Sequence, residues 1–310
     1  MRVIVVGMGV QGKKRLAVAG KDAVATVDPV APDARYKRIE DVPLETYDAA
    51  LVCTPDAAKI ELLTYLLSNQ KHLLVEKPLF GNPGDLLSLK NLAAKNHVTC
   101  YTAYNHRFEP HFVRMKELLD SGRLGRIYCI RMFYGNGTAR LVRDSAWRDK
   151  GAGVLPDLGS HLLDTVLFWL GNEVSGFTVH SANRFENRAY DHVVFGTNAG
   201  PVLQFEVTLL SWRNHHYTDV FAEKGSAHIQ SLCKWGPSTF TVRDRRLPSG
   251  RPDEKSVMLV QPDPTWEAEY RHFKNLCEKG GSNIGNDIWI NEVLGGLSAR
   301  LDANAVLAHR

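Results

Sequence analysis

The stretch VIVVGMGVQG, residues 3–12, decides the fold of this chain. Its first four residues are all β-branched, which is typical of a parallel strand buried on both faces. The three glycines that follow have GxGxxG spacing, and they lie between this expected strand and an expected helix. The spacing alone is weak evidence, because short glycine patterns arise by chance. The strand before it and the helix after it are what favour a dinucleotide-binding turn.

Each residue of this turn has a physical task in such a site. Gly7 permits the tight turn, Gly9 lets the backbone approach a pyrophosphate, and Gly12 allows close packing of helix on strand. The start of the helix supplies N–H groups and a positive dipole for phosphates. Asp28, at the end of the next expected strand, can accept hydrogen bonds from the adenine ribose. The alternative is a purely structural glycine turn in another α/β fold.

Asp28 also bears on the choice of cofactor. A carboxylate at this place repels a 2′-phosphate, so NAD is favoured. Lys37 and Arg38 lie just downstream and could weaken this preference, so NADP stays possible.

Strands and helices alternate through the first hundred residues, which predicts βαβ units and a parallel sheet. After about residue 120 successive strands follow one another without helices, which favours an antiparallel sheet. We therefore expect an α/β Rossmann dinucleotide-binding domain over residues 1–119 and an α+β substrate domain with a mainly antiparallel sheet over residues 120–310. A C-terminal helix that packs back on the first domain is left open. The polar segment 243–255 reads as a mobile loop.

Three residues are candidates for catalysis. Lys77 follows the expected strand 72–75, at the edge of a doubly wound sheet where ligands bind. Asp157 and His161 are four apart at an expected helix start, and a histidine exchanges protons near neutral pH. Taken singly, each has a plain alternative: a solvated lysine, an aspartate that caps the helix, and a buried structural histidine. No third metal ligand accompanies the Asp/His pair, so we expect no metal.

Composition excludes several other classes of protein. The 310 residues carry a net charge of +4, and Lys and Arg are scattered rather than blocked, which speaks against nucleic acid as a partner. The five cysteines have no CxxC pair, which fits a reducing cytoplasm. The first apolar run, of four residues, reads as a buried strand rather than a signal peptide. No stretch approaches the ~20 apolar residues that cross a membrane.

Six motifs in order resemble the Gfo/Idh/MocA family, the glucose–fructose oxidoreductase and inositol dehydrogenase group. They are GMGVQG at 7–12, TP at 54–55, EKPL at 76–79, YNHRFEP at 104–110, SGRLGRI at 121–127 and WRDKGAGVLPDLGSHLLD at 147–164. The resemblance covers roughly residues 1–170. Beyond that it depends on the strand pattern only.

The resemblance implies that Lys77, Asp157 and His161 form the catalytic group and that the Lys77–Pro78 peptide is often cis. The expected cofactor-binding residues are Gly7, Gly9, Val10, Gln11, Gly12, Asp28, Thr54, Pro55, Glu76 and Lys77. Family members often have histidines where this chain has Arg15 and Lys59. Both departures are expected to add positive charge near the cofactor's phosphates.

The implied reaction is the reversible oxidation of a secondary hydroxyl of a sugar, polyol or sugar nucleotide. Hydride goes to the nicotinamide, Lys77 or His161 takes the proton, and Asp157 holds the geometry. Asn105, Arg107, Trp147 and Arg148 are expected to join the catalytic residues in contacting substrate, with an interdomain salt bridge as the alternative for Arg107. Arg140 and Arg143 are further candidates for an anionic substrate.

The resemblance also implies a sheet with one open face, which favours a homodimer or homotetramer. Phe205, Val207 and Leu209 are consistent with an apolar open face, although the same residues would also suit the domain's own core. Two other functions stay open: a non-enzymatic NAD(P)-binding sensor or regulator, and an NAD-dependent hydrolase or epimerase that oxidises its substrate transiently.

Overall fold

The computed structural model describes residues 1–145 and 148–308, and the chain divides into two compact units. The first comprises Met1–Asn105 and Thr265–Asn291, and the second comprises His106–Pro264 and the chain from Glu292 onward. The boundary expected at 119/120 differs from this division. Helix α4 (Pro110–Asp120) packs against α6 (Ser160–Leu170) and β11 (Gly225–Gln230), so residues 106–119 belong with the second unit.

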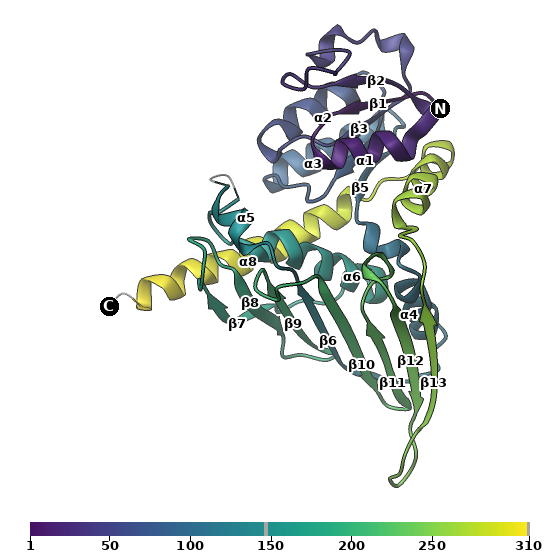
Figure 1. Cartoon of the computed structure of the whole chain (residues 1–310), viewed down its shortest axis with the longest axis vertical. Helices are drawn as coiled ribbons and strands as arrows, with labels where there is room; N and C mark the ends of the chain where they lie inside the picture. Colours follow the sequence, from purple (N-terminus) through teal and green to yellow (C-terminus); the bar gives the residue numbers. More distant parts are fainter. Residues whose placement is uncertain (146–147, 309–310) are drawn as a thin grey trace. The chain divides into compact units, whose positions relative to one another are not determined.

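The first unit is a doubly wound parallel sheet with strand order β2-β1-β3-β4-β5, as the sequence predicted (Figure 1). The strands are β1 (Val3–Val6), β2 (Ala23–Val27), β3 (Ala49–Val52), β4 (His72–Glu76) and β5 (Cys100–Ala103). The helices are α1 (Val10–Ala19), α2 (Lys59–Ser68), α3 (Pro83–Lys95), α7 (Thr265–Lys279) and the first part of α8 (Ile284–Ala308). The strand order reverses between β1 and β3, where ligands of such sheets bind.

An apolar layer packs against each face of this sheet. Ile4 and Val6 pack into one layer, to which α2 and α3 contribute leucines such as Leu66. Val3 and Val5 pack into the other, to which α7 contributes Tyr270 and Phe273. Alternate residues of β1 therefore enter opposite layers, which explains why the whole strand is apolar.

The second unit is built on an eight-stranded sheet of order β13-β12-β11-β10-β6-β9-β8-β7 (Figure 1). Neighbouring strands are antiparallel except for β6 and β9, which are parallel. The strands are β6 (Ile127–Gly135), β7 (Thr178–Asn183), β8 (His192–Thr197), β9 (Val202–Thr208), β10 (His215–Ala222), β11, β12 (Ser238–Asp244) and β13 (Asp253–Leu259). The remaining helix, α5, spans Ala139–Arg143.

One expectation for this sheet was wrong, and one question that the sequence left open is answered. Segment 243–255 is not a loop throughout, because β13 begins at Asp253 and pairs with β12 along its length. This edge strand is exposed at nearly every position and carries charges, so no apolar alternation marked it. Phe205, Val207 and Leu209 do not face outward either: they are at most 2% exposed and belong to the unit's own core.

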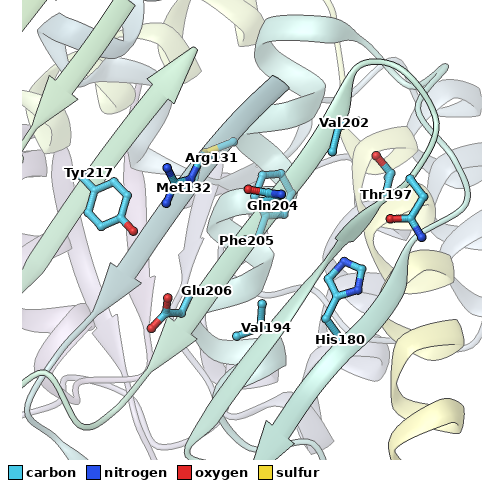
Figure 2. A pocket seen from close by; sticks show the side chains of 11 residues that line it. Arg131, Met132, His180, Val194, Thr197, Val202, Gln204, Phe205, Glu206 and Tyr217 are labelled. Atoms are coloured by element: carbon cyan, nitrogen blue, oxygen red, sulfur yellow. The ribbon is translucent and has the colours of Figure 1, made fainter. Parts of the chain in front are cut away.

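The open face is instead polar and aromatic (Figure 2). Gln204 and Glu206, the residues that alternate with the buried ones on β9, line a pocket of about 380 Å³ together with Arg131 and Tyr217. Tyr217 stacks on Phe133 of β6, with ring centroids 5.4 Å apart. Across the described residues, none of the helices combines the length and the apolar character needed to cross a membrane.

Candidate cofactor and catalytic site

The glycine turn after β1 is fixed by close backbone approaches. Gly7 has φ +91°, and a Cβ there would lie 2.7 Å from the carbonyl oxygen of Cys53. A Cβ on Gly12 would lie 1.8 Å from the carbonyl oxygen of Gly7. Gly9 differs, because a Cβ there would meet nothing within 4 Å. Gly7 and Gly12 are thus required by the fold, whereas Gly9 faces open space that a ligand can fill.

The surroundings of Gly9 fit a dinucleotide. Helix α1 has no side-chain cap and no acidic residue in its first turn, so its first N–H groups suit phosphate oxygens. Val10 is 74% exposed beside them. The Oγ1 atom of Thr54, which follows β3, is buried without a hydrogen-bond partner among the described residues. Together these groups fit a bound pyrophosphate and its neighbouring ribose.

Asp28 is held in place by three backbone N–H groups. Its carboxylate accepts from Met8 at 2.7 Å, and from Val30 and Ala31 at 2.8 Å each. These bonds, that of Met8 foremost, lower the pKa of Asp28, so the carboxylate stays ionised at neutral pH. Lys37 donates to the Ala31 carbonyl oxygen at 2.5 Å. A fixed negative charge therefore ends β2, at the place where the expected recognition of NAD needs one.

Arg15 does not add positive charge beside the phosphates, contrary to expectation. It is 1% exposed, and its guanidinium lies 2.6 Å from Glu76 and 2.7 Å from Glu269. Burial by itself would lower the pKa of Arg15, but the two carboxylates raise it overall. The Trp266 ring covers the guanidinium at 4.3 Å. Arg15 is thus a buried structural cation, and the Glu76 carboxylate is its partner.

Lys59 is the second departure, and it too has a structural task. Its Nζ atom is buried and donates to the carbonyl oxygens of Glu76, at 2.9 Å, and Pro78, at 2.7 Å. A third bond goes to Asp56 at 2.8 Å. The two carbonyls flank Lys77, and the Lys77–Pro78 peptide is cis, as the resemblance suggested. Lys59 therefore fixes the backbone from which Lys77 projects.

Asp157 and His161 lie in the second unit, around a π-helical turn (Leu155–Gly159) that leads into α6. The two residues are thus not joined by an ordinary α-helical step. The residue at the N-cap of α6 is Gly159 rather than Asp157, and the Asp157 carboxylate lies 3.4 Å from Arg148 Nη2. His161 is 6% exposed and stacks on His106, with ring centroids 4.2 Å apart.

The sequence did not single out Tyr134 and Lys234, which lie near His161 and its neighbour His106. Tyr134 meets its ring edge-on at 5.7 Å, and Lys234 Nζ lies 3.4 Å from His106 Nε2. Burial lowers the pKa of nearby His216 to about 3, so this histidine is neutral. His106 lies within the YNHRFEP motif, which was the one signal available. Lys234 lies in a region without any motif.

Arg107 forms an ion pair within the second unit. Its guanidinium forms a two-pronged ion pair with Asp164, with distances of 2.8 Å and 2.7 Å. Burial raises the pKa of Asp164, and Arg107 opposes this. Asn105, in the first unit, donates to Thr265 Oγ1 at 3.0 Å.

The remaining basic candidates are dispersed. Arg140 is exposed on α5, and Arg143 donates to the Glu186 carbonyl oxygen at 3.4 Å. Trp147 lies outside the described residues. Among the described residues, the arrangement that could ligate a metal comprises Glu109, Cys233 and Asp263, and it includes neither Asp157 nor His161.

Fold and site together define a dinucleotide-binding protein with a second, sheet-based domain. The chain belongs to the Gfo/Idh/MocA oxidoreductase family. Residues 1–104 match the family's NAD-binding Rossmann fold, and residues 112–228 match its C-terminal domain.

Curated relatives agree with this membership, and a solved structure agrees with the fold. Inositol 2-dehydrogenase 1 of Saccharopolyspora erythraea is 30% identical over 66% of this chain and 59% of its own length. Glucose-6-phosphate 3-dehydrogenase of Bacillus subtilis is 27% identical over 43% of this chain and 39% of its own length. The chain therefore spans about half the length of these curated relatives. The structure of levoglucosan dehydrogenase with NADH superposes with a TM-score of 0.81 at 17% identity, covering 97% of each chain.

Proposed function

We propose that this protein is an NAD-dependent dehydrogenase that oxidises a secondary hydroxyl of a sugar, polyol or sugar nucleotide, reversibly. One observation carries the proposal. Gly7, Thr54 and Lys77 follow β1, β3 and β4, so the glycine turn, an unpartnered hydroxyl and the candidate lysine share one edge of the parallel sheet. The activities named for the relatives support the substrate class.

The residues divide the work in this proposal. The nicotinamide, when bound, supplies hydride acceptance and donation. Lys77 stabilises the developing alkoxide, and either His161 or Lys77 takes up the single hydroxyl proton. Asp157, which Arg148 contacts, orients the reacting hydroxyl. Asp28 recognises the ribose and disfavours a 2′-phosphate.

Lys77→Ala tests the proposal. NADH formation is measured with myo-inositol, levoglucosan, glucose 6-phosphate and UDP-N-acetylglucosamine, and NAD affinity is measured separately by calorimetry. We expect turnover to fall by about 10²–10⁴-fold with NAD affinity nearly kept, because Lys77 acts on the substrate. Lys90→Ala, an exposed lysine on α3, is the control and should keep full turnover.

Other outcomes identify the alternatives. Unchanged turnover in Lys77→Ala refutes the role of Lys77. Tight NAD binding without any sugar-dependent chemistry favours a sensor or regulator. A converted sugar without net NADH favours a hydrolase or epimerase that oxidises its substrate transiently.

We also propose a homodimer or homotetramer that is formed through the open face of the second sheet. The pocket of Arg131, Gln204, Glu206 and Tyr217 offers charges of both signs beside an aromatic stack, which suits pairing with a second copy. A monomer in sedimentation at micromolar concentration contradicts this.

The five cysteines are all free thiols, which supports a reducing, cytoplasmic location.

A further inference from the structure

Residues 231–236, between β11 and β12, form a segment that is bent at both ends. Ser231 has φ +66° and Gly236 has φ +119°, both in the left-handed region. Ser231 is the informative one, because a residue with a side chain seldom adopts this conformation and does so where the surrounding structure holds it. Its N–H donates to the carbonyl oxygen of His216 at 2.9 Å. The bend therefore attaches the segment to β10 beside the buried histidines.

Contacts on both sides of Lys234 hold this segment in place. The Cys233 N–H donates to Glu109 Oε2 at 3.2 Å, and Cys233 itself is buried. The Trp235 ring lies against the Tyr134 ring, with centroids 5.8 Å apart. The backbone before and after Lys234 is thus fixed to neighbouring elements, and the lysine side chain projects from a defined place.

The ammonium group of Lys234 acts first on His106. Its Nζ atom lies 3.4 Å from His106 Nε2. Because an ammonium group has donors only, Nε2 is the acceptor, which assigns a neutral His106 ring with its proton on Nδ1. A protonated His106 would instead direct an N–H group at the ammonium group and add a like charge beside it. Lys234 therefore favours the neutral form of His106.

His106 carries this effect to His161. The two rings stack with centroids 4.2 Å apart and planes inclined by 22°. Their protonation is coupled, because two positive charges at such a distance disfavour each other. With the charge of Lys234 beside His106, each proton added to the stack is disfavoured further. The arrangement therefore favours an unprotonated His161, which is the form that accepts a proton.

Two other rings near the stack carry no charge. His216 lies 6.3 Å from His106 between ring centroids, and burial, followed by the charge of Lys234, lowers its pKa to about 3. Tyr134 meets His161 edge-on at 5.7 Å, and burial raises the pKa of its phenol, which keeps its proton. Neither ring supplies a charge that could replace that of Lys234.

The carboxyl groups near the stack act against Lys234. Asp157, on the turn that leads into α6, favours a proton on His161. Glu109 and Asp263 adjoin the residue before Lys234. Burial raises the pKa of Glu109, and the charge of Lys234 opposes this. The protonation of His161 is thus a balance between Asp157 and Lys234, and removal of Lys234 shifts it toward the protonated ring.

We propose that Lys234 is a positioning residue of the candidate catalytic site, which acts through His106 and keeps His161 ready to accept the proton of the substrate hydroxyl. In this step the substrate carbon gives up a hydride, which the bound cofactor accepts. The hydroxyl proton goes to His161, and the electron pair of the O–H bond forms the C=O bond. The inference rests on the proposed function, in the version in which His161 rather than Lys77 accepts the proton.

The titration of His161 is measured directly, by long-range ¹H–¹⁵N NMR of the full-length protein labelled with ¹⁵N-histidine. The His161 resonances are assigned with His161→Gln. In Lys234→Met we expect the midpoint of the His161 titration to rise by about 0.5–1 pH unit, because a positive charge is removed. Lys234→Gln removes the same charge and should move the midpoint in the same direction.

Two variants separate the charge of Lys234 from other effects. Lys234→Arg keeps the positive charge and should keep the wild-type midpoint. Lys224→Met removes an exposed lysine of the same unit and is the matched control, which should also keep it. The proposal is overturned if the midpoint does not move in Lys234→Met and Lys234→Gln, or if Lys234→Arg behaves as they do.

The pH profile of turnover tests the catalytic part. The acid limb of kcat/KM for sugar oxidation reports the base of the free enzyme. In Lys234→Met this limb should therefore move to higher pH by the same amount as the His161 midpoint. A loss of kcat/KM that is equal at every pH would show that Lys234 has only a structural role, and it would overturn the proposal.

Failure of the proposed function gives a different result. If the midpoint moves as expected but the wild-type protein oxidises no sugar or polyol, the proposed function fails and the control of His161 by Lys234 stands. If the wild-type protein oxidises a sugar and the midpoint stays in place, Lys234 loses this role and the proposed function is kept.

Discussion

The Nζ atom of Lys59 lies 2.9 Å from the carbonyl oxygen of Glu76, the residue that precedes Lys77. A second bond, to the Pro78 carbonyl oxygen, fixes the peptide on the other side. A lysine at the start of α2 thereby positions the candidate catalytic lysine at the end of β4. Because Lys59 acts through the backbone, its effect should be on geometry rather than on proton transfer itself.

Lys59→Met should lower kcat by roughly 10–100-fold while NAD affinity changes little, since a displacement of about 1 Å at the reacting groups has costs of this size. Lys71→Met is the matched control. Lys71 also donates to two backbone carbonyls of the first unit, those of Leu44 and Tyr47, but it lies before β4 rather than at the end of that strand, which Lys77 follows. Both variants should lose stability, measured by urea denaturation. Equal loss of kcat in the two would show that Lys59 acts only through stability.

Gly9 and Gly12 should respond to alanine in opposite ways. At Gly9 a Cβ meets no atom within 4 Å and φ is −68°, so Gly9→Ala should fold with an unchanged melting temperature but bind NAD at least tenfold more weakly. At Gly12 a Cβ overlaps the Gly7 carbonyl oxygen, so Gly12→Ala should lose about 3 kcal/mol or more of stability. Calorimetry and thermal melts check both. Full NAD affinity in Gly9→Ala would argue against a pyrophosphate at this turn.

Asp28→Asn should relax the preference for NAD over NADP. The change removes the negative charge and keeps the oxygen that the N–H groups of Val30 and Ala31 share, while the bond from Met8 to the other carboxylate oxygen is lost. We expect the ratio of the two dissociation constants to shift about tenfold or more toward NADP at low salt, with less effect as salt screens the charge. Asp33→Asn, an exposed position in the same loop, should leave the ratio as it is. A wild-type protein that prefers NADP would refute the role of Asp28.

Arg107→Ala should destabilise the second unit by about 3–5 kcal/mol at neutral pH, because it leaves the buried carboxylate of Asp164 without its partner. Burial already raises the pKa of Asp164, and loss of Arg107 raises it further. The folded variant then holds a proton that the unfolded chain releases, so its stability rises as pH falls from 7 toward 5. Urea denaturation at both pH values measures this. Lys116→Ala, which breaks an exposed pair with Asp120, should change little at either pH.

Local pattern was enough for the parallel sheet of the first unit and for the candidate residues at its edge, but not for the assignment of α7 to this unit. The apolar run at 3–6, the glycines and the residues that follow each strand identified the parallel sheet and its binding edge. The alternation of polar Gln204 and Glu206 with apolar Phe205 and Val207 also indicates which face of β9 is buried. The edge strand β13 could not be predicted from the sequence, because it is stabilised by pairing with β12 rather than by burial of its own side chains.

The partners of Arg15 and Lys59 could not be predicted for a different reason. Glu269 is about 250 residues from Arg15 in the chain, and only the packing of α7 against α1 brings them together. Arg15 stands where family members often have histidine, and from the sequence alone this difference suggested an added positive charge at the cofactor site. In the structure it is part of a buried ionic group, and its partner Glu269 lies on a helix that no motif described.

The position of α7 has a consequence for how the protein is made. Tyr270 and Phe273 complete one apolar layer of the first unit, and Glu269 completes the ion pairs of Arg15. These residues are translated about 160 residues after the last strand of that sheet. During synthesis, one face of the parallel sheet therefore lacks its covering helix α7 until all strands of the second sheet have been made. A chain that stops before α7 would therefore leave this apolar face of the sheet exposed to water.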